Sequence, residues 1–228
     1  MSERWPEAVV FDLDGTLIDS VGDITDALNG ALLKTGLEPF SEAEVRLMVG
    51  GGARVLVERV LNARNLSESV ALAQQLYAAF MEIYQSGSVA RTSVFDNARE
   101  LLEALRRQGI KCAICTNKPA HITNDVLAKL GMRDSFEVVV GGTEALPKKP
   151  HPAMLLAALA ALGVDRSRAV MVGDSMADVG AARAADVPVI VVSHGYSKTP
   201  ADELGADLVI NSLSELSDAL CKLIRRGS

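Results

Sequence analysis

Apolar and polar residues follow two rhythms along the chain. A short apolar run at 8–12 is followed, from about residue 20 to 90, by apolar residues every three or four positions, which is the spacing of helices. From about residue 93, short apolar runs alternate with amphipathic stretches. The alternation predicts strands at 110–115, 137–141, 168–172, 187–192 and 207–210, and helices at 97–107, 120–130, 152–162, 176–185 and 213–225.

This alternation of strands and helices predicts an α/β fold. Short apolar runs between helices are typical of parallel strands that are buried on both faces. We therefore expect a doubly wound, mostly parallel sheet built from residues 1–18 and 93–228. Residues 19–92 interrupt this core and are expected to form a separate helical cap domain, with hinges near 17–20 and 88–94.

Composition narrows the class of protein. Hydrophobic residues make up 49% of the chain and aromatic residues only 4%, which favours the aliphatic core of a sheet covered by helices. The net charge of −6 argues against nucleic acid as a partner. No stretch approaches the roughly 20 apolar residues of a membrane span, and the first residues lack the apolar region of a signal peptide. We expect a cytoplasmic protein with no membrane partner.

Two carboxylates follow the first apolar run, in the segment Asp12-Leu13-Asp14-Gly15-Thr16. Side chains alternate along a strand, so Asp12 and Asp14 can act together only where the strand ends and the backbone turns. Charges placed at the end of a buried strand are costly to the fold. They suit attack by one carboxylate on phosphorus, with the second handling protons and a hard cation between them.

A second acidic motif, Gly173-Asp174-Ser175 with Asp178, follows another apolar run. Because doubly wound sheets bind ligands beyond the carboxyl ends of their strands, we expect Asp174 and Asp178 near the first motif. A divalent cation would relieve the repulsion there, and oxygen ligands beside a phosphate favour Mg²⁺. Taken alone, Asp174 is equally consistent with a helix N-cap, and the first acidic motif favours the metal site.

Two further segments offer groups for binding a phosphoryl oxygen. Thr116-Asn117 follows a predicted strand and comes just before a predicted helix, whose N-terminus attracts anions. Lys149-Pro150 lies in a segment with two prolines that would present the lysine at a fixed place. Each has a simpler explanation, turn chemistry for Thr116-Asn117 and a solvated surface side chain for Lys149. The acidic motifs favour the phosphate-binding role.

Together, the four motifs resemble those of the haloacid dehalogenase superfamily, in the same order. The resemblance implies a Rossmann-like core with a helical cap inserted after the first strand. It implies that Asp12 forms an aspartyl-phosphate, while Asp14 protonates the leaving oxygen and then activates water. It also implies roles for the remaining residues. Thr116, Asn117 and Lys149 would bind the phosphoryl group, and Asp12, the Asp14 carbonyl, Asp174 and Asp178 would surround Mg²⁺.

Within the superfamily, the chain resembles bacterial phosphoglycolate phosphatases along nearly its whole length. This implies hydrolysis of a small phosphorylated metabolite, with 2-phosphoglycolate the first candidate. Gly51 and Gly52 are interpreted as a loop that closes over the substrate with its backbone amides, the alternative being an ordinary break between helices. Arg54 is either a partner for a substrate carboxylate or a solvated helix residue.

Other functions remain open from the sequence. A sugar phosphate or pyrophosphate could replace 2-phosphoglycolate as substrate. A phosphomutase resembling β-phosphoglucomutase would share Asp12 and Asp14, but Ile24 stands where such enzymes tend to have a cap histidine. A non-catalytic binding protein would be expected to lack Asp12, Asp14 or Lys149, and all three are present. The oligomeric state is left between a monomer and a homodimer.

Overall fold

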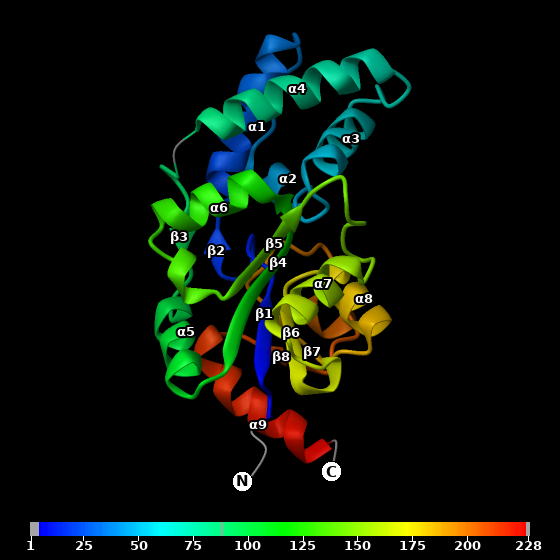
Figure 1. The fold of residues 1–228 in the computed structure, drawn as a ribbon. Coiled ribbons are helices and arrows are strands. Elements are labelled where there is room, and N and C mark those ends of the chain that lie inside the picture. Colours follow the sequence, from blue (N-terminus) through cyan, green and yellow to red (C-terminus); the bar gives the residue numbers. More distant parts are fainter. Residues whose placement is uncertain (1–4, 88, 227–228) are drawn as a thin grey trace.

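A six-stranded parallel sheet forms the core of the protein, as seen in the computed structural model, which describes residues 5–87 and 89–226 (Figure 1). The strand order is β5-β4-β1-β6-β7-β8. The strands are β1 (Ala8–Phe11), β4 (Lys111–Pro119), β5 (Val138–Gly142), β6 (Ala169–Gly173), β7 (Val189–Val192) and β8 (Leu208–Ile210). All six were predicted from the apolar runs, and the main difference is that β4 continues to Pro119.

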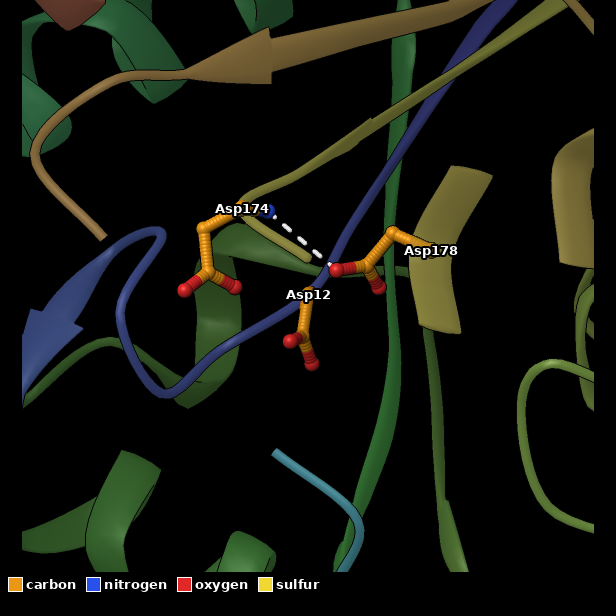
Figure 2. Close-up of side chains that lie close together, drawn as sticks. All are labelled: Asp12, Asp174 and Asp178. Carbon is orange, nitrogen blue, oxygen red and sulfur yellow. Dashed lines mark hydrogen bonds between the residues drawn. The ribbon is translucent and has the colours of Figure 1, made fainter. Parts of the chain in front are cut away.

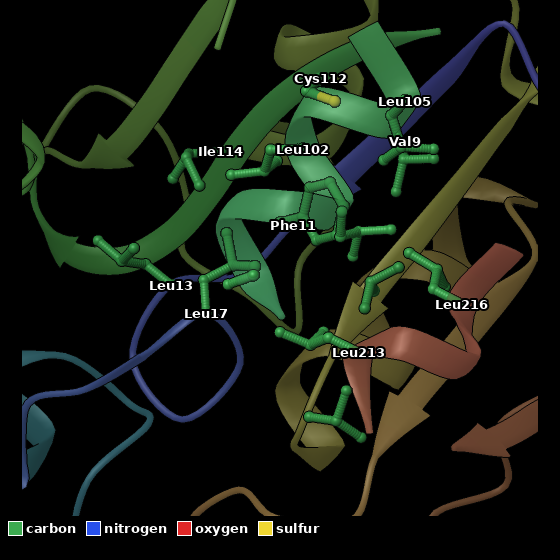
Figure 3. Packing of buried hydrophobic residues seen from close by; sticks show 14 of the residues in the cluster. Val9, Phe11, Leu13, Leu17, Leu102, Leu105, Cys112, Ile114, Leu213 and Leu216 are labelled. Atoms are coloured by element: carbon green, nitrogen blue, oxygen red, sulfur yellow. The ribbon is translucent and has the colours of Figure 1, made fainter. Parts of the chain in front are cut away.

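Helices cover both faces of the sheet, because side chains of successive strand residues point to opposite faces. Val9 and Phe11 belong to one apolar cluster, shown in Figure 3, and Ala8 and Val10 to another. The first face is covered by α5 (Ala98–Arg107), α6 (Ala120–Lys129) and α9 (Leu216–Arg226), and the second by α7 (Ala153–Leu162) and α8 (Met176–Ala185). The doubly wound α/β fold is therefore confirmed.

A layer of helices lies beyond the end of the sheet (Figure 1). It consists of α1 (Val21–Lys34), α2 (Glu42–Arg46), α3 (Ala53–Ala63) and α4 (Val70–Ser86). These helices, here called the helical layer, pack around an apolar cluster of their own that includes Leu28, Val60 and Phe80. Tyr196, which follows β7, joins this cluster from the core. Within the described part of the chain, no helix is both long and apolar enough to span a membrane.

The chain passes twice between the sheet and the helical layer, and the two passages lie side by side. The short strands β2 (Ile18–Asp19) and β3 (Ser93–Val94) pair in antiparallel fashion, and Phe95 N donates to Leu17 O over 3.0 Å. Sequence analysis did not predict this ribbon, because two residues are too few to show a strand pattern. Residues 1–4 of the expected core and residue 88 of the expected hinge lie outside the described residues.

Candidate active site

Three buried carboxylates meet at the carboxyl end of the sheet (Figure 2). Asp12 follows β1, Asp174 follows the neighbouring strand β6, and Asp178 lies in the first turn of α8. One oxygen from each of them lies within 4.8 Å of the others. The structure thus brings together side chains that are more than 160 positions apart in sequence, because β1 and β6 are adjacent in the sheet.

Asp12 is electrostatically strained. Burial raises its pKa from 3.8 to about 6, with Lys149 lowering and Asp178 raising it. Its buried Oδ1 accepts no hydrogen bond from the described residues. The Lys149 ammonium lies 2.9 Å from that oxygen as an ion-pair partner, but outside hydrogen-bond geometry. A buried carboxylate oxygen without a directed donor is available to a cation or to an electrophile.

Asp174 and Asp178 differ in how many of their oxygen atoms are already engaged by hydrogen-bond donors. Burial, together with the charges of Asp178 and Asp12, raises the pKa of Asp174 well above its ordinary value. Asp174 Oδ2 accepts from Tyr196 N over 2.7 Å, and its Oδ1 lies 3.5 Å from Thr16 Oγ1. Both Asp178 oxygens are engaged, Oδ1 by Lys149 and Oδ2 by backbone and hydroxyl donors of Asp174 and Ser175.

These observations test whether the cluster suits a metal ion. The ligands that the cluster offers are carboxylate oxygens, which hard divalent cations prefer, and Asp12 Oδ1, which accepts no hydrogen bond from the described residues, lies among them. The donor set therefore fits such a cation, with Asp12 and Asp174 as the side chains free to bind it. Asp178, which we expected beside the metal, belongs to the cluster and also holds Lys149 and the backbone at Asp174 in place.

Two glycines allow loops to close onto Asp174. Gly15 has a φ of +85°, and a Cβ there would lie 2.5 Å from Asp174 Oδ2. A Cβ on Gly195 would lie 2.1 Å from Asp174 Cβ. Real Cβ atoms do not approach other atoms this closely, so both loops depend on the absence of a side chain.

Asp14 lies apart from the acidic cluster. Its Oδ1 accepts from Ser20 Oγ over 2.5 Å and from Lys118 Nζ over 2.8 Å. Lys118 Nζ also donates to Tyr84 OH, which belongs to α4. The Asp14 side chain is therefore paired with Lys118 and not with the carboxylates of the Asp12 cluster.

Lys149 and Asn117 are hydrogen-bonded to each other beside the acidic cluster. Lys149 Nζ donates to Asp178 Oδ1 and to Cys115 O, each over 2.6 Å. Burial lowers the pKa of Lys149, but the carboxylates of Asp12 and Asp178 raise it above its ordinary value, so the ammonium stays charged. Asn117 Oδ1 accepts from Lys149 N, and its Nδ2 donates to Lys149 O and Gly50 O. The Asn117 side chain, expected to contact substrate, thus holds two protein segments together.

A pocket lies between the acidic edge of the sheet and the helical layer. This pocket is partly open to solvent. Its polar side carries Asp12, Asp14, Thr116, Asn117 and Lys118, and its apolar side carries Ile24, Val49, Ala53, Leu56 and Phe80. Thr116 Oγ1 accepts from Lys118 N over 3.3 Å, so its own proton remains available for a ligand oxygen.

The structure separates the three cap residues that the sequence grouped together. Gly52 lines this pocket, at the start of α3, with a φ of +84°. Gly51 lines a neighbouring groove instead. Arg54 was a candidate for binding a substrate carboxylate, but it pairs with Glu144 at 3.2 Å and lies outside the pocket lining. The reason is helical geometry, because Ala53 and Leu56 line the pocket from one face of α3, and Arg54 lies on another face of the same helix.

Sequence analysis missed Lys118 and Tyr84. Lys118 escaped because the strand was expected to end before it, whereas β4 continues to Pro119. Had the strand been extended, alternation would have placed Lys118 on the same side as Thr116. Tyr84 carried no comparable signal, since an aromatic residue at helical spacing is typical of an apolar core.

The chain is similar to known proteins over almost its whole length. A family model described as haloacid dehalogenase-like hydrolase matches residues 9–192. Phosphoglycolate phosphatase of Rhodospirillum rubrum is 44% identical over 219 residues, covering 94% of this chain and 91% of the relative. Phosphoglycolate phosphatase of Caulobacter vibrioides is 39% identical over 216 residues, covering 95% and 91%.

Solved structures show the same similarity. A crystal structure described as a predicted phosphoglycolate phosphatase from Haemophilus somnus has a TM-score of 0.87 and 28% sequence identity. The match covers 96% of this chain and 99% of that chain. It therefore includes the helical layer as well as the sheet.

Proposed function

The chain belongs to the haloacid dehalogenase-like hydrolase family, and we propose that it is a Mg²⁺-dependent phosphatase acting on 2-phosphoglycolate. The observation that carries the reaction type is Asp12, a buried carboxylate whose Oδ1 has no directed hydrogen-bond donor among the described residues. It lies at the wall of a pocket that also contains Asp14. A nucleophile and a separate acid are the two groups that ester hydrolysis through a covalent intermediate requires.

The reaction proceeds in two displacements. An Asp12 carboxylate oxygen attacks the phosphorus atom, the bond from phosphorus to the ester oxygen breaks, and Asp14 gives its proton to the leaving alcohol. Asp14 then removes a proton from a water molecule, which attacks the phosphorus of the aspartyl-phosphate. The bond to Asp12 breaks, releasing inorganic phosphate and restoring both carboxyl groups.

Positioning and charge neutralisation supply most of the acceleration in such transfers. Thr116 Oγ1 and the Lys149 ammonium lie beside Asp12 and would bind the phosphoryl oxygens. Asp12 and Asp174 would hold Mg²⁺, which when bound neutralises negative charge so that a carboxylate can approach a phosphate. Asp178 would keep Lys149 in position. We further propose that the helical layer acts as a cap, which excludes water from the first step.

The shape and chemistry of the pocket favour a small substrate. The side chains of Ile24, Leu56 and Phe80 in its lining are apolar and offer no partners for the hydroxyl groups of a sugar. Ile24 also lacks the proton-transfer capacity that a mutase would use. The relatives reported above are named phosphoglycolate phosphatases, and phosphoglycolate is a two-carbon ester.

Phosphate release from a substrate panel tests the proposal. The panel contains 2-phosphoglycolate, hexose phosphates, phosphoserine, nucleotides and pyrophosphate, each with and without Mg²⁺. We expect Mg²⁺-dependent release, with the highest kcat/KM for 2-phosphoglycolate. The Asp12→Asn variant should lose at least about 10³-fold in kcat, whereas the surface variant Asp125→Asn should not change it.

The outcomes separate the reaction type from the substrate. A hexose phosphate with the highest kcat/KM would reject 2-phosphoglycolate but keep the phosphatase. An Asp12→Asn variant with undiminished activity would reject the covalent mechanism. No release from any ester would reject the phosphatase itself.

A further inference from the structure

One residue in the pocket has no part in the reaction sequence above. Lys118 is the single cationic side chain among the described residues that line the pocket. It is almost fully buried, with 4% of its surface exposed. Although burial lowers it, Asp14 and Tyr84 raise the pKa of Lys118 above its ordinary value, so the ammonium is retained at neutral pH.

The contacts of Lys118 place it next to the ester oxygen of a bound substrate. Lys118 Nζ lies 2.8 Å from Asp14 Oδ1 and 3.2 Å from Asp14 Oδ2. Asp14 must reach the ester oxygen in order to protonate it. In 2-phosphoglycolate, a single methylene group separates that oxygen from the carboxylate, so the carboxylate comes within reach of the same ammonium.

Arg54 and Lys149, the two cationic residues that the sequence singled out, are held by other contacts. Arg54 is turned away and paired with Glu144, and Lys149 is held by Asp178 on the side of the phosphoryl group. Several residues of the helical layer that line the pocket, among them Ile24, Leu56 and Phe80, are apolar. A substrate carboxylate that entered the pocket without meeting Lys118 would lose part of its hydration and gain no cationic partner from the lining, which is unfavourable.

We propose that Lys118 recognises the substrate carboxylate and thereby selects phosphomonoesters that carry a carboxylate one carbon from the ester oxygen. On substrate binding, the ammonium exchanges its ion pair with Asp14 for the incoming carboxylate, and Asp14 takes up from solvent the proton that it then gives to the ester oxygen. Tyr84 OH positions the lysine from the helical layer, and the Tyr84 ring lies 4.9 Å from Nζ. This inference rests on the proposed phosphatase function and adds the determinant of its specificity.

A pair of matched substrates isolates the carboxylate. Ethyl phosphate has a methyl group where 2-phosphoglycolate has its carboxylate and is otherwise the same ester. For the Lys118→Met variant, we expect kcat/KM to fall about 100-fold or more on 2-phosphoglycolate and less than about 10-fold on ethyl phosphate. Lys129→Met, a surface substitution on α6, should leave both values unchanged.

A binding measurement is needed that does not depend on catalysis. The phosphonate 3-phosphonopropionate keeps the carboxylate of 2-phosphoglycolate, and propylphosphonate replaces it with a methyl group. By calorimetry with Mg²⁺, the wild type should bind 3-phosphonopropionate more tightly than propylphosphonate, and Lys118→Met should abolish the difference. Lys118→Gln, which keeps a hydrogen-bond donor for Asp14 but removes the charge, serves if the methionine variant does not fold.

Equal losses on the two esters, together with an unchanged preference between the two phosphonates, would overturn the proposal. Lys118 would then act only on Asp14. If the wild-type enzyme hydrolysed ethyl phosphate and 2-phosphoglycolate with equal kcat/KM, the proposed substrate would be rejected instead. A wild-type enzyme that hydrolyses neither would reject that substrate as well. In both cases the phosphonate comparison still decides what Lys118 binds.

Discussion

Burial of Asp12 disfavours the ionised form of this residue, which is the form that reacts, and so lowers the stability of the folded protein at neutral pH. Its pKa in the folded protein is about 6, against an ordinary value of 3.8. Between these values the folded state holds a proton that the unfolded chain has released. The contribution of Asp12 to stability is therefore fully present below about pH 4 and is lost as the pH rises through 6.

This sign leads to a prediction for the metal-free protein. At pH 7, Asp12→Asn should be more stable than the wild type by up to roughly 3 kcal/mol, the equivalent of the shift in pKa. The gap should close below about pH 4. Urea unfolding in the presence of a chelator, from pH 4 to 7.5, measures it, with Asp125→Asn as a surface control. A wild type that is the more stable protein at pH 7 would contradict the assignment.

Mg²⁺ should reverse the order of these two proteins. The cation binds the ionised form of Asp12, so it should raise the midpoint of thermal unfolding of the wild type, and more at pH 7 than at pH 5. The Asp12→Asn variant, which offers no carboxylate there, should gain much less at either pH. Equal gains for both proteins would place the cation elsewhere.

Single residues also show how far the sequence could predict the site. Asp12, Asp14 and Asp174 could be located because each follows a buried apolar run, and strand ends gather at one edge of such a sheet. Lys118 could not be located, because its role depends on a strand that continues through Pro119 and on a tyrosine from another layer. Arg54 and Asn117 have suitable chemistry, but contacts made in the folded chain direct them elsewhere.

At the scale of elements, the strands defined by continuous apolar runs were predictable, and the two-residue strands were not. The strands of the core lie within about two residues of their expected ends, apart from the extension of β4, because continuous apolar runs define them. The β2–β3 ribbon has two residues in each strand and depends on pairing between residues 74 and 76 positions apart, which local patterns do not contain. The loop after β7 likewise acquires its role only through contact with Asp174.

That loop provides a test of how elements shape the metal site. In Gly195→Ala, the new Cβ would lie 2.1 Å from Asp174 Cβ, so the loop and the carboxylate must move apart. We expect the Mg²⁺ concentration for half-maximal activity to rise at least about 10-fold, since displaced supporting contacts weaken metal binding to this degree. Activity titrated against Mg²⁺ measures the shift, and circular dichroism checks the fold.

The control for this variant is Gly163→Ala. Gly163 has a φ of +64° and no atom within 4 Å of the new Cβ, so the substitution adds backbone strain without touching the cluster. It should lower thermal stability and leave the Mg²⁺ requirement unchanged. If both variants changed the requirement equally, general destabilisation would explain the effect and the role of the loop would be rejected.

The Asn117 side chain joins β4 to the loops that contain Gly50 and Lys149, and its removal should lower both stability and kcat. Asn117→Ala leaves Lys149 N without its buried acceptor, which should destabilise the protein by about 1–3 kcal/mol. Because Lys149 would also be less well positioned beside Asp12, kcat should fall for every ester, irrespective of its carboxylate. Unfolding in urea and kcat on two esters check both effects. A loss confined to 2-phosphoglycolate would instead indicate direct substrate contact.

At the scale of the whole molecule, the sheet and the helical layer have separate apolar clusters and meet across the pocket. Directed polar contacts connect them there. Lys118 bonds to Tyr84, and the Tyr196 hydroxyl donates to Asp19 Oδ1 and accepts from Ser20 N at the ribbon. Apolar contacts add to the connection, because Met81 and Tyr84 of α4 pack against the cluster of the sheet and Tyr196 belongs to that of the helical layer. A connection with so few buried residues is expected to open at lower cost than either cluster.

We therefore expect the helical layer to open and close on the ribbon, and ligand binding to favour the closed state. Mg²⁺ with 3-phosphonopropionate should slow amide hydrogen exchange at residues 50–56 and 80–84, two segments that contribute residues to the pocket lining, more than at the buried strands β1 and β6. Mg²⁺ alone, which in our proposal would be held by Asp12 and Asp174 on the sheet side, should not. Tyr84→Phe removes one contact between the layers, so its exchange at 80–84 should be faster without ligand. Unchanged exchange at a saturating ligand concentration, established by calorimetry, would mean that substrate enters a pocket that does not need to open.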